Sequence, residues 1–195
     1  MHFSTTITAL YLLHTTTAQT TSSKRGLIYI DTEAADNDLF DSSTSDLTWY
    51  YNYAAIPSAA FSKSQADFEY VPMLWGAPSS TTDTSFSDGV KALVSGGRNI
   101  SHVLAFNEPD GTSSTGGSAI DPSLAASTWI RELEPLRDLG IKLGAPAVTG
   151  AQTGFTWLSS FFDACNGNCT ADFIPIHWYG DFQGLASHIG QVSAA

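Results

Sequence analysis

The chain has 195 residues, enough for one domain with a substantial core but short for two. Its formal net charge is −11, which disfavours electrostatic attraction to nucleic acid or to an anionic membrane, so we expect neither as a partner. Charged residues make up only 14% of the chain, and aromatic residues make up 12%. A weakly charged, aromatic-rich surface suits a neutral polar ligand that stacks on rings, such as a carbohydrate.

The first 24 residues predict export from the cell. Residues 7–13 form an apolar run that is too short to span a bilayer, and Thr16 and Ala18 are small residues at the positions that precede a cleavage site. We therefore predict a secretory signal peptide at residues 1–18 and a short linker at residues 19–24; a disordered polar tail is the alternative. No later segment reaches about 18 uninterrupted apolar residues, so the sequence predicts no membrane span.

Six apolar, strand-like runs follow, and helix-like stretches lie between several of them. Strands are predicted at residues 26–30, 49–53, 68–75, 102–107, 141–148 and 172–179. Helices are predicted at residues 85–97, 121–140 and 154–165, where apolar residues recur at helical spacing. Strands that alternate with helices predict parallel βα units, and nearly continuous apolar runs predict strands that are covered on both faces.

The ends of the predicted strands favour a closed barrel over an open sheet. No Gly-rich phosphate-binding loop follows the first run, which disfavours a dinucleotide-binding sheet. Several runs end in polar or aromatic groups, as in a barrel whose site lies at the carboxyl ends of its strands: Asn52, Trp75, Asn107-Glu108 and His177-Trp178-Tyr179. An eight-unit barrel typically needs about 250 residues, whereas six units fill this chain. We therefore predict an incomplete α/β fold of the (β/α)8 TIM-barrel type, with residues 25–195 as one domain truncated before strands seven and eight.

Glu108 is the strongest candidate for a catalytic residue. The apolar residues 103–106 stop at Asn107 and Glu108, and Pro109 then stiffens the exit from the strand. A carboxyl group held at the end of a buried strand can protonate the leaving oxygen in glycoside cleavage, and the neighbouring amide can hydrogen-bond a sugar hydroxyl. A helix-capping or loop carboxylate is the alternative for Glu108.

Aromatic side chains at two other strand ends are candidates for substrate binding. Trp178 or Tyr179 can offer a ring as a sugar platform, and His177 or Tyr179 can donate a hydrogen bond into the site. Trp75 ends an earlier run and is a candidate for the same reason. Packing in the core is the alternative for each of these four residues.

The cysteine content predicts a disulfide and no metal site. Cys165 and Cys169 are separated by three residues that a disulfide can close into a loop, whereas a zinc site would need a second pair of ligands that the chain lacks. The acidic residues 31–46 lack the spacing of a calcium loop, so we interpret them as a solvated loop. The sequence thus predicts no metal and no other cofactor. Sequons at Asn99 and Asn168 predict N-glycosylation, with Asn168 inside the cystine loop.

A family resemblance emerges from stretches that occur in a fixed order. They are KRGLIYI, LTWYYNY, EYVPMLWG, VLAFNEPD, IKLGAPAVT and DFIPIHWYG, together with the helix-like WLSSFFDAC. Over residues 24–195 the chain resembles glycoside hydrolase family 128. Two positions depart from the family pattern, since Ala105 stands where glycine is common and Tyr53 where tryptophan is common.

The resemblance implies a secreted (β/α)8 barrel that hydrolyses β-1,3-glucan by a retaining mechanism. It implies that Glu108 is the acid/base and that Asn107 contacts the sugar. It further implies that the cleft is lined by Trp75, His177, Trp178 and Tyr179. We expect a β-glucan polysaccharide or oligosaccharide as the partner and a monomeric protein.

The resemblance also implies a residue that this sequence lacks. A retaining mechanism needs a second carboxylate about 5 Å from the first, and in this family it is a glutamate that ends strand seven. The glutamates after Glu108 are Glu132 and Glu134, both within a helix-like stretch. We therefore expect the nucleophile to be absent and this chain to be inactive by itself. The alternative is a non-catalytic β-glucan-binding or cell-wall-associated protein that kept the cleft.

Overall fold

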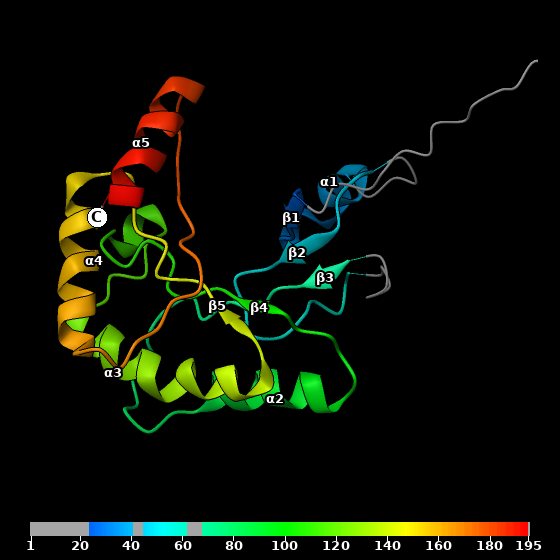
Figure 1. The fold of residues 1–195 in the computed structure, drawn as a ribbon. Coiled ribbons are helices and arrows are strands. Elements are labelled where there is room, and N and C mark those ends of the chain that lie inside the picture. Colours follow the sequence, from blue (N-terminus) through cyan, green and yellow to red (C-terminus); the bar gives the residue numbers. More distant parts are fainter. Residues whose placement is uncertain (1–23, 41–44, 62–67, 195) are drawn as a thin grey trace, which may run out of the picture.

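The computed structural model describes residues 24–40, 45–61 and 68–194 (Figure 1). The predicted signal peptide therefore lies outside the described residues, as does all of the linker except Lys24. In the described part, short parallel strands alternate with helices, and they form an α/β fold as predicted. The first sheet has the order β1 (Gly26–Ile28), β2 (Trp49–Tyr51), β3 (Glu69–Tyr70), and the second pairs β4 (His102–Val103) with β5 (Lys142–Leu143).

Single parallel bridges join these pieces into one row that follows the order of the chain. Met73 pairs with Leu104, which places the end of the third run beside the fourth. Gly144 pairs with Phe173, which places the sixth run beside β5. All six predicted runs are therefore present, parallel and consecutive in space.

Regular pairing in these runs is shorter than the sequence predicts. The run 172–179 has a single bridge at Phe173, and β3, β4 and β5 cover only two residues each. The runs of β3 and β5 and the run 172–179 each contain a proline, namely Pro72, Pro146 or Pro175, whereas the run of β4 contains none. Proline has no backbone N–H to give to a neighbouring strand, so the ladder stops near it.

The predicted helices are confirmed with small changes of boundary. They are α2 (Ser85–Ser95), α3 (Pro122–Glu132) and α4 (Gln152–Cys165), and α5 (Phe182–Ala194) follows the sixth run. The helix predicted over residues 121–140 is divided: a 3₁₀ helix (Glu134–Leu139) follows α3 because Pro135 interrupts the α-helical hydrogen bonds. At the start of α3, the Asp121 side chain accepts hydrogen bonds from the backbone N–H groups of Ser123 and Leu124.

The acidic segment is more ordered than the solvated loop that the sequence predicts. Within it, a 3₁₀ helix (Asp31–Glu33), α1 (Ala34–Asn37) and a second 3₁₀ helix (Asp38–Phe40) form three short turns. The side chain of Asn37 donates to the Ile30 carbonyl and ties these turns to the end of the first strand run.

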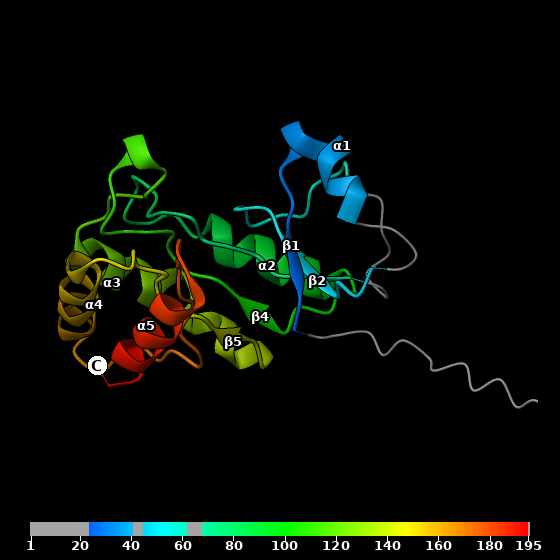
Figure 2. The ribbon, with the colours of Figure 1, turned by 90° about the horizontal axis from the view of Figure 1, so that it is seen from above.

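The two faces of the row of strands differ. Helices α2 and α3 lie along one face (Figure 1). Tyr50, Tyr70, Phe106 and Trp129 are among the buried residues of the core. The opposite face borders a cavity of about 540 Å³, lined by Thr48, Trp49, Glu69, Val71, His102, Leu104 and Phe173. The sequence predicts strands that are covered on both faces. Among the described residues, only the face toward α2 and α3 is fully covered. Helices α4 and α5 lie at one end of the molecule, and α1 and β1 lie at the other (Figures 1 and 2).

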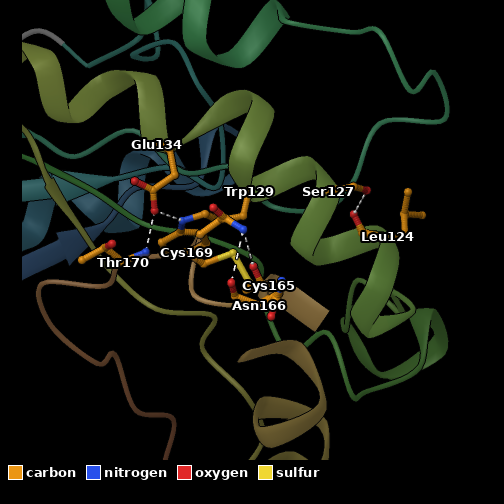
Figure 3. The surroundings of a disulfide bond; sticks show 9 residues. Leu124, Ser127, Trp129, Glu134, Cys165, Asn166, Cys169 and Thr170 are labelled. Atoms are coloured by element: carbon orange, nitrogen blue, oxygen red, sulfur yellow. Dashed lines mark hydrogen bonds between the residues drawn. A yellow bond between two sulfur atoms is a disulfide. The ribbon is translucent and has the colours of Figure 1, made fainter. Parts of the chain in front are cut away.

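The predicted disulfide between Cys165 and Cys169 is present and closes the end of α4 (Figure 3). The loop that it closes packs beside α3. Glu134 accepts hydrogen bonds from the indole of Trp129 and from the backbone N–H of Thr170, which ties the loop to the end of α3. None of the helices in the described residues combines the length and apolar character that crossing a bilayer requires.

Candidate active site

The ends of four strand runs, the second, third, fourth and sixth, meet around a cavity of about 440 Å³. They contribute Tyr53 after β2, Trp75 after β3, Asn107 and Glu108 after β4, and His177 and Tyr179 at the end of the sixth run. The loop between β4 and α3 adds Thr115 and Gly116. Because parallel strands end at the same edge, side chains that are far apart in the sequence meet here.

The carboxylate of Glu108 lies in this cavity, paired with an imidazole. Its Oε1 atom is 2.8 Å from Nδ1 of His177, and both side chains are mostly buried. The oxygens of an ionised carboxylate only accept hydrogen bonds, so Nδ1 of His177 carries the hydrogen in that state and donates it. The pair fixes the position of the carboxylate within the cavity.

The backbone of Glu108 has an unusual conformation that its neighbours maintain. Its φ angle is 42°, in the left-handed region that residues other than glycine rarely adopt. The N–H of Glu108 donates to the carbonyl of Ala147, and its own carbonyl accepts from Gly111, both at 2.8 Å. Sparsely populated backbone conformations of this kind persist only where the surrounding structure holds them, and they cluster at functional sites.

Asn107 lines the cavity and carries a buried acceptor. The residue is 7% exposed, and Nδ2 donates to the carbonyl of Gly116 at 3.0 Å. Its Oδ1 atom has no hydrogen-bond partner among the described residues. Since buried amide oxygens are normally hydrogen-bonded, Oδ1 is suited to accept a hydrogen bond from a ligand hydroxyl.

The loop after Glu108 folds back tightly on it. A Cβ atom at Gly117 would lie 2.5 Å from the carbonyl carbon of Gly111 and 2.7 Å from the carbonyl oxygen of Glu108, so only glycine fits. The carboxylate of Asp110 accepts hydrogen bonds from both the backbone N–H and the hydroxyl of Thr149. These contacts join the segment after β4 to the segment after β5.

Aromatic rings form the more exposed walls of the cavity. Trp75 is 39% exposed and Tyr179 is 90% exposed. Tyr53 also lines the cavity; its φ is 58°, and its ring meets that of Tyr51 edge-on at 5.1 Å. Burial holds the pKa of the Tyr51 hydroxyl well above its ordinary value, and a hydrogen bond with Tyr53 raises it further, so the phenol stays protonated. Sugars bind well to rings of this kind that combine an apolar face with a polar tip.

The structure places Trp178 outside the wall of this cavity. Its indole stacks on His188 of α5, with ring centroids 5.5 Å apart, and donates to the carbonyl of Asp181. Gly184 leaves room for the ring, since a Cβ there would be 2.1 Å from it. Side chains in an extended segment alternate in direction, so Trp178 points away from the cavity that His177 and Tyr179 line.

Sequence reasoning did not include Tyr53, Thr115 and Gly116 among the site residues. Tyr53 was noted only as a departure from a family pattern. Thr115 and Gly116 lie in a Ser/Thr/Gly-rich loop that carries no chemical motif. The signal that could have found this loop is its place directly after a strand that ends in a candidate acid.

Among the described residues that line the cavity, Glu108 is the one carboxylate. Glu132 and Glu134 lie in the helical layer, as the sequence predicts: Glu132 is fully buried between α2 and α3, and Glu134 lies beside the disulfide loop. The described residues contain no group of three or more His, Cys, Asp or Glu side chains arranged to hold a metal ion. A buried carboxyl group such as that of Glu108 is suited to general acid/base chemistry.

This site and fold agree with the family to which the chain belongs. Residues 26–195 match the family described as glycosyl hydrolase catalytic core, so the chain belongs to that family. It is 36% identical over 176 residues to alkali-sensitive linkage protein 1 of Schizosaccharomyces pombe, and the match covers 88% of this chain and 29% of that protein.

Two of the similar solved structures are endo-β-1,3-glucanases of glycoside hydrolase family 128, subgroup II. The one from Sorangium cellulosum is 27% identical with a TM-score of 0.65, covering 87% of this chain and 68% of that one. The one from Pseudomonas viridiflava is 27% identical with a TM-score of 0.66, covering 89% and 67%. The resemblance to family 128 is thereby confirmed, and the chain spans less than a third of the S. pombe protein.

Proposed function

We propose that this chain is part of a glycoside hydrolase that acts on β-1,3-glucan, with Glu108 as the acid/base. One observation carries the proposal: Glu108 follows the fourth strand run and is paired with His177, in a cavity lined by Trp75, Tyr53 and Tyr179. The family membership and the β-1,3-glucanases among the similar structures support the reaction and the substrate class.

We also propose that the six strand runs are consecutive units of a (β/α)8 barrel. The parallel bridges that follow chain order support this, as does the meeting of the strand ends around one cavity. The hollow face opposite α2 and α3 is then the interior of the barrel. In such barrels the site lies at the carboxyl ends of the strands, where Glu108 lies here.

In the proposed reaction, Glu108 gives a proton to the glycosidic oxygen as the bond to the anomeric carbon breaks. His177 holds the carboxyl group toward the cavity, and Oδ1 of Asn107 accepts a hydrogen bond from a hydroxyl of the reacting sugar. Trp75, Tyr53 and Tyr179 stack on the chain of sugars. A retaining mechanism needs a second carboxylate about 5 Å from the first as nucleophile. We propose that this group comes from outside the 195 residues, so that they bind glucan and do not cleave it unaided.

External azide tests this proposal because it can replace the missing nucleophile. Residues 19–195 are incubated with laminari-oligosaccharides, with and without sodium azide. Azide attacks the anomeric carbon from the face opposite the leaving sugar, and Glu108 protonates the leaving oxygen. We expect α-glycosyl azide by mass spectrometry, and no product without azide. Cleavage without azide would contradict the missing nucleophile, whereas binding with no azide product would favour a non-catalytic glucan-binding protein.

We propose export for the same protein. The Cys165–Cys169 disulfide supports this, because structural disulfides persist in oxidising compartments. The sequon residues Asn99 and Asn168 are both exposed, which a glycosylation site requires. Expression in a eukaryotic secretory host, followed by glycosidase treatment and mass measurement, tests both proposals.

A further inference from the structure

We infer that Arg131 and Glu132, adjacent residues of α3, are positioning residues that hold Trp75 in place for sugar binding. Neither residue is placed among those that line the Glu108 cavity. They act on residues 76–84, the segment that connects Trp75 to the start of α2. The inference rests on the proposed function, because it assumes that Trp75 contacts glucan.

Glu132 supplies part of the N-terminal cap of α2 from another helix. The N-cap residue of α2, Thr84, makes no side-chain cap bond, and its hydroxyl donates to Asp88 instead. Oε2 of Glu132 accepts a hydrogen bond from the backbone N–H of Ser87 at 3.0 Å. The Glu132 side chain is 0% exposed. Since the first N–H groups of a helix have no partner within it, this buried carboxylate fixes where α2 begins.

Arg131 holds the segment just before α2. Its Nε donates to the carbonyl of Asp83 at 2.6 Å, and Nη1 donates to the carbonyl of Thr81 at 3.0 Å. The same Nε lies 3.6 Å from Oε1 of Glu132. The planar guanidinium thus links two carbonyls of one segment to the carboxylate that caps the next helix.

The other end of the segment reaches the active site directly. The carbonyl of Trp75 accepts a hydrogen bond from the backbone N–H of Asn107 at 3.0 Å. Trp75 and Glu132 both line a second cavity, of about 210 Å³, together with Pro78 and Phe86. Trp75 lines this cavity and also the one that contains Glu108. When residues 81–84 are loosened, the segment after Trp75 loses an anchor, and the position of Trp75 between the two cavities is less well fixed.

The test compares Glu132→Gln with a matched control, Glu134→Gln. Both substitutions neutralise a carboxylate that accepts a backbone N–H from another segment, Ser87 in one case and Thr170 in the other. Only the partner of Glu132 belongs to the segment that follows Trp75. Binding of laminari-oligosaccharides is followed by isothermal titration calorimetry, and the fold is checked by circular dichroism. We expect Glu132→Gln to weaken binding about fivefold, the effect of losing one ordinary hydrogen bond, and Glu134→Gln to leave it unchanged.

A double-mutant cycle with Trp75→Ala separates positioning from a general loss of stability. In the Trp75→Ala background, Glu132→Gln should have no further effect on affinity, because the ring that it positions is gone. An undiminished effect in that background overturns the inference, as does an equal effect of the two glutamine substitutions. If Glu132→Gln does not fold, Arg131→Lys takes its place in the same cycle. Lysine keeps the positive charge but lacks the planar guanidinium that donates to both carbonyls. Failure of the wild-type chain to bind overturns the proposed function and the inference with it.

Discussion

The segment after β4 and the sixth run meet at the hydrogen bond between Glu108 and His177, but they are held in different ways. Residues 107–118 are fixed by backbone bonds to the segments after β3 and β5 and by the fit of Gly117 against Glu108. Residues 173–179 have one bridge, at Phe173, and end in a tyrosine that is 90% exposed. The position of Glu108 is therefore set by backbone contacts of its own segment. The positions of His177 and Tyr179 depend on a few side-chain contacts.

We expect the largest effect from Glu108→Gln, which lies in the segment 107–118 that backbone bonds fix. In the azide-dependent reaction the rate should fall by roughly 10²–10⁴-fold, the usual contribution of general acid catalysis. Affinity for laminari-oligosaccharides should stay within a few-fold, because the amide keeps the shape of the side chain. Product release by mass spectrometry and binding by calorimetry measure the two effects. An unchanged rate would remove Glu108 from the acid role.

Gly117→Ala tests how tightly that region is packed. The added methyl group must displace the backbone at Gly111 and Glu108, so the free energy of unfolding should fall by about 1–3 kcal/mol, as in other overpacked sites. The matched control is Gly190→Ala in α5, where nothing lies within 4 Å of the new Cβ. Urea denaturation should show that the control is neutral or slightly more stable, because alanine favours helix over glycine. Equal losses in the two variants would contradict the packing argument.

The disulfide lies just before the sixth run, and its removal should have a smaller effect. Cys165→Ser with Cys169→Ser opens a loop with a sequence separation of only 4, so the loss should be at most about 2 kcal/mol. Binding of laminari-oligosaccharides should be unchanged, since the loop contacts α3 and not the cavity. Denaturation of the oxidised and the double-serine proteins measures the difference. A drop in affinity that matches the drop in stability would show that the two regions are coupled.

Asp172 begins the sixth run, and its substitution should have the smallest effect. The backbone N–H of Leu143 and the side chains of Lys142 and Arg137 hold the pKa of Asp172 below its usual value. A lowered pKa in the folded state stabilises the protein above the unfolded pKa, and the effect is lost as pH falls through the folded value. Asp172→Asn should therefore cost about 1 kcal/mol at pH 7, with partial exposure limiting the loss.

The dependence on pH is the control for that substitution. The difference between Asp172→Asn and wild type should shrink as the pH falls below 3.8, the ordinary value for aspartate, because Asp172 then gains its proton in the unfolded chain first and in the folded protein at a lower pH. Urea denaturation at pH 7 and at about pH 2 measures this. A difference that is the same at both pH values would mean that the charge of Asp172 plays no part.

Much of the fold and the centre of the site could be predicted from the sequence, because they depend on local patterns. Apolar periodicity located all six strand runs and the three helices, and the break after residues 103–106 located Glu108. The direction of Trp178 could not be predicted, since it depends on which face of the last run turns toward α5. The hydrogen bond that Glu132 makes could not be predicted either, because its partner, Ser87, is 45 residues away in the chain. Side chains whose partners are distant need the fold before their roles can be assigned.

The hydrogen bonding of Asn107 has a consequence for chemical probes of this protein. Its amide nitrogen donates to the carbonyl of Gly116, so the oxygen that has no partner can accept a hydrogen bond but cannot give one. A sugar in which fluorine replaces the recognised hydroxyl has no hydrogen to offer, and it leaves Oδ1 buried without a partner. Such a fluorinated analogue should therefore bind this site more weakly than the parent sugar does.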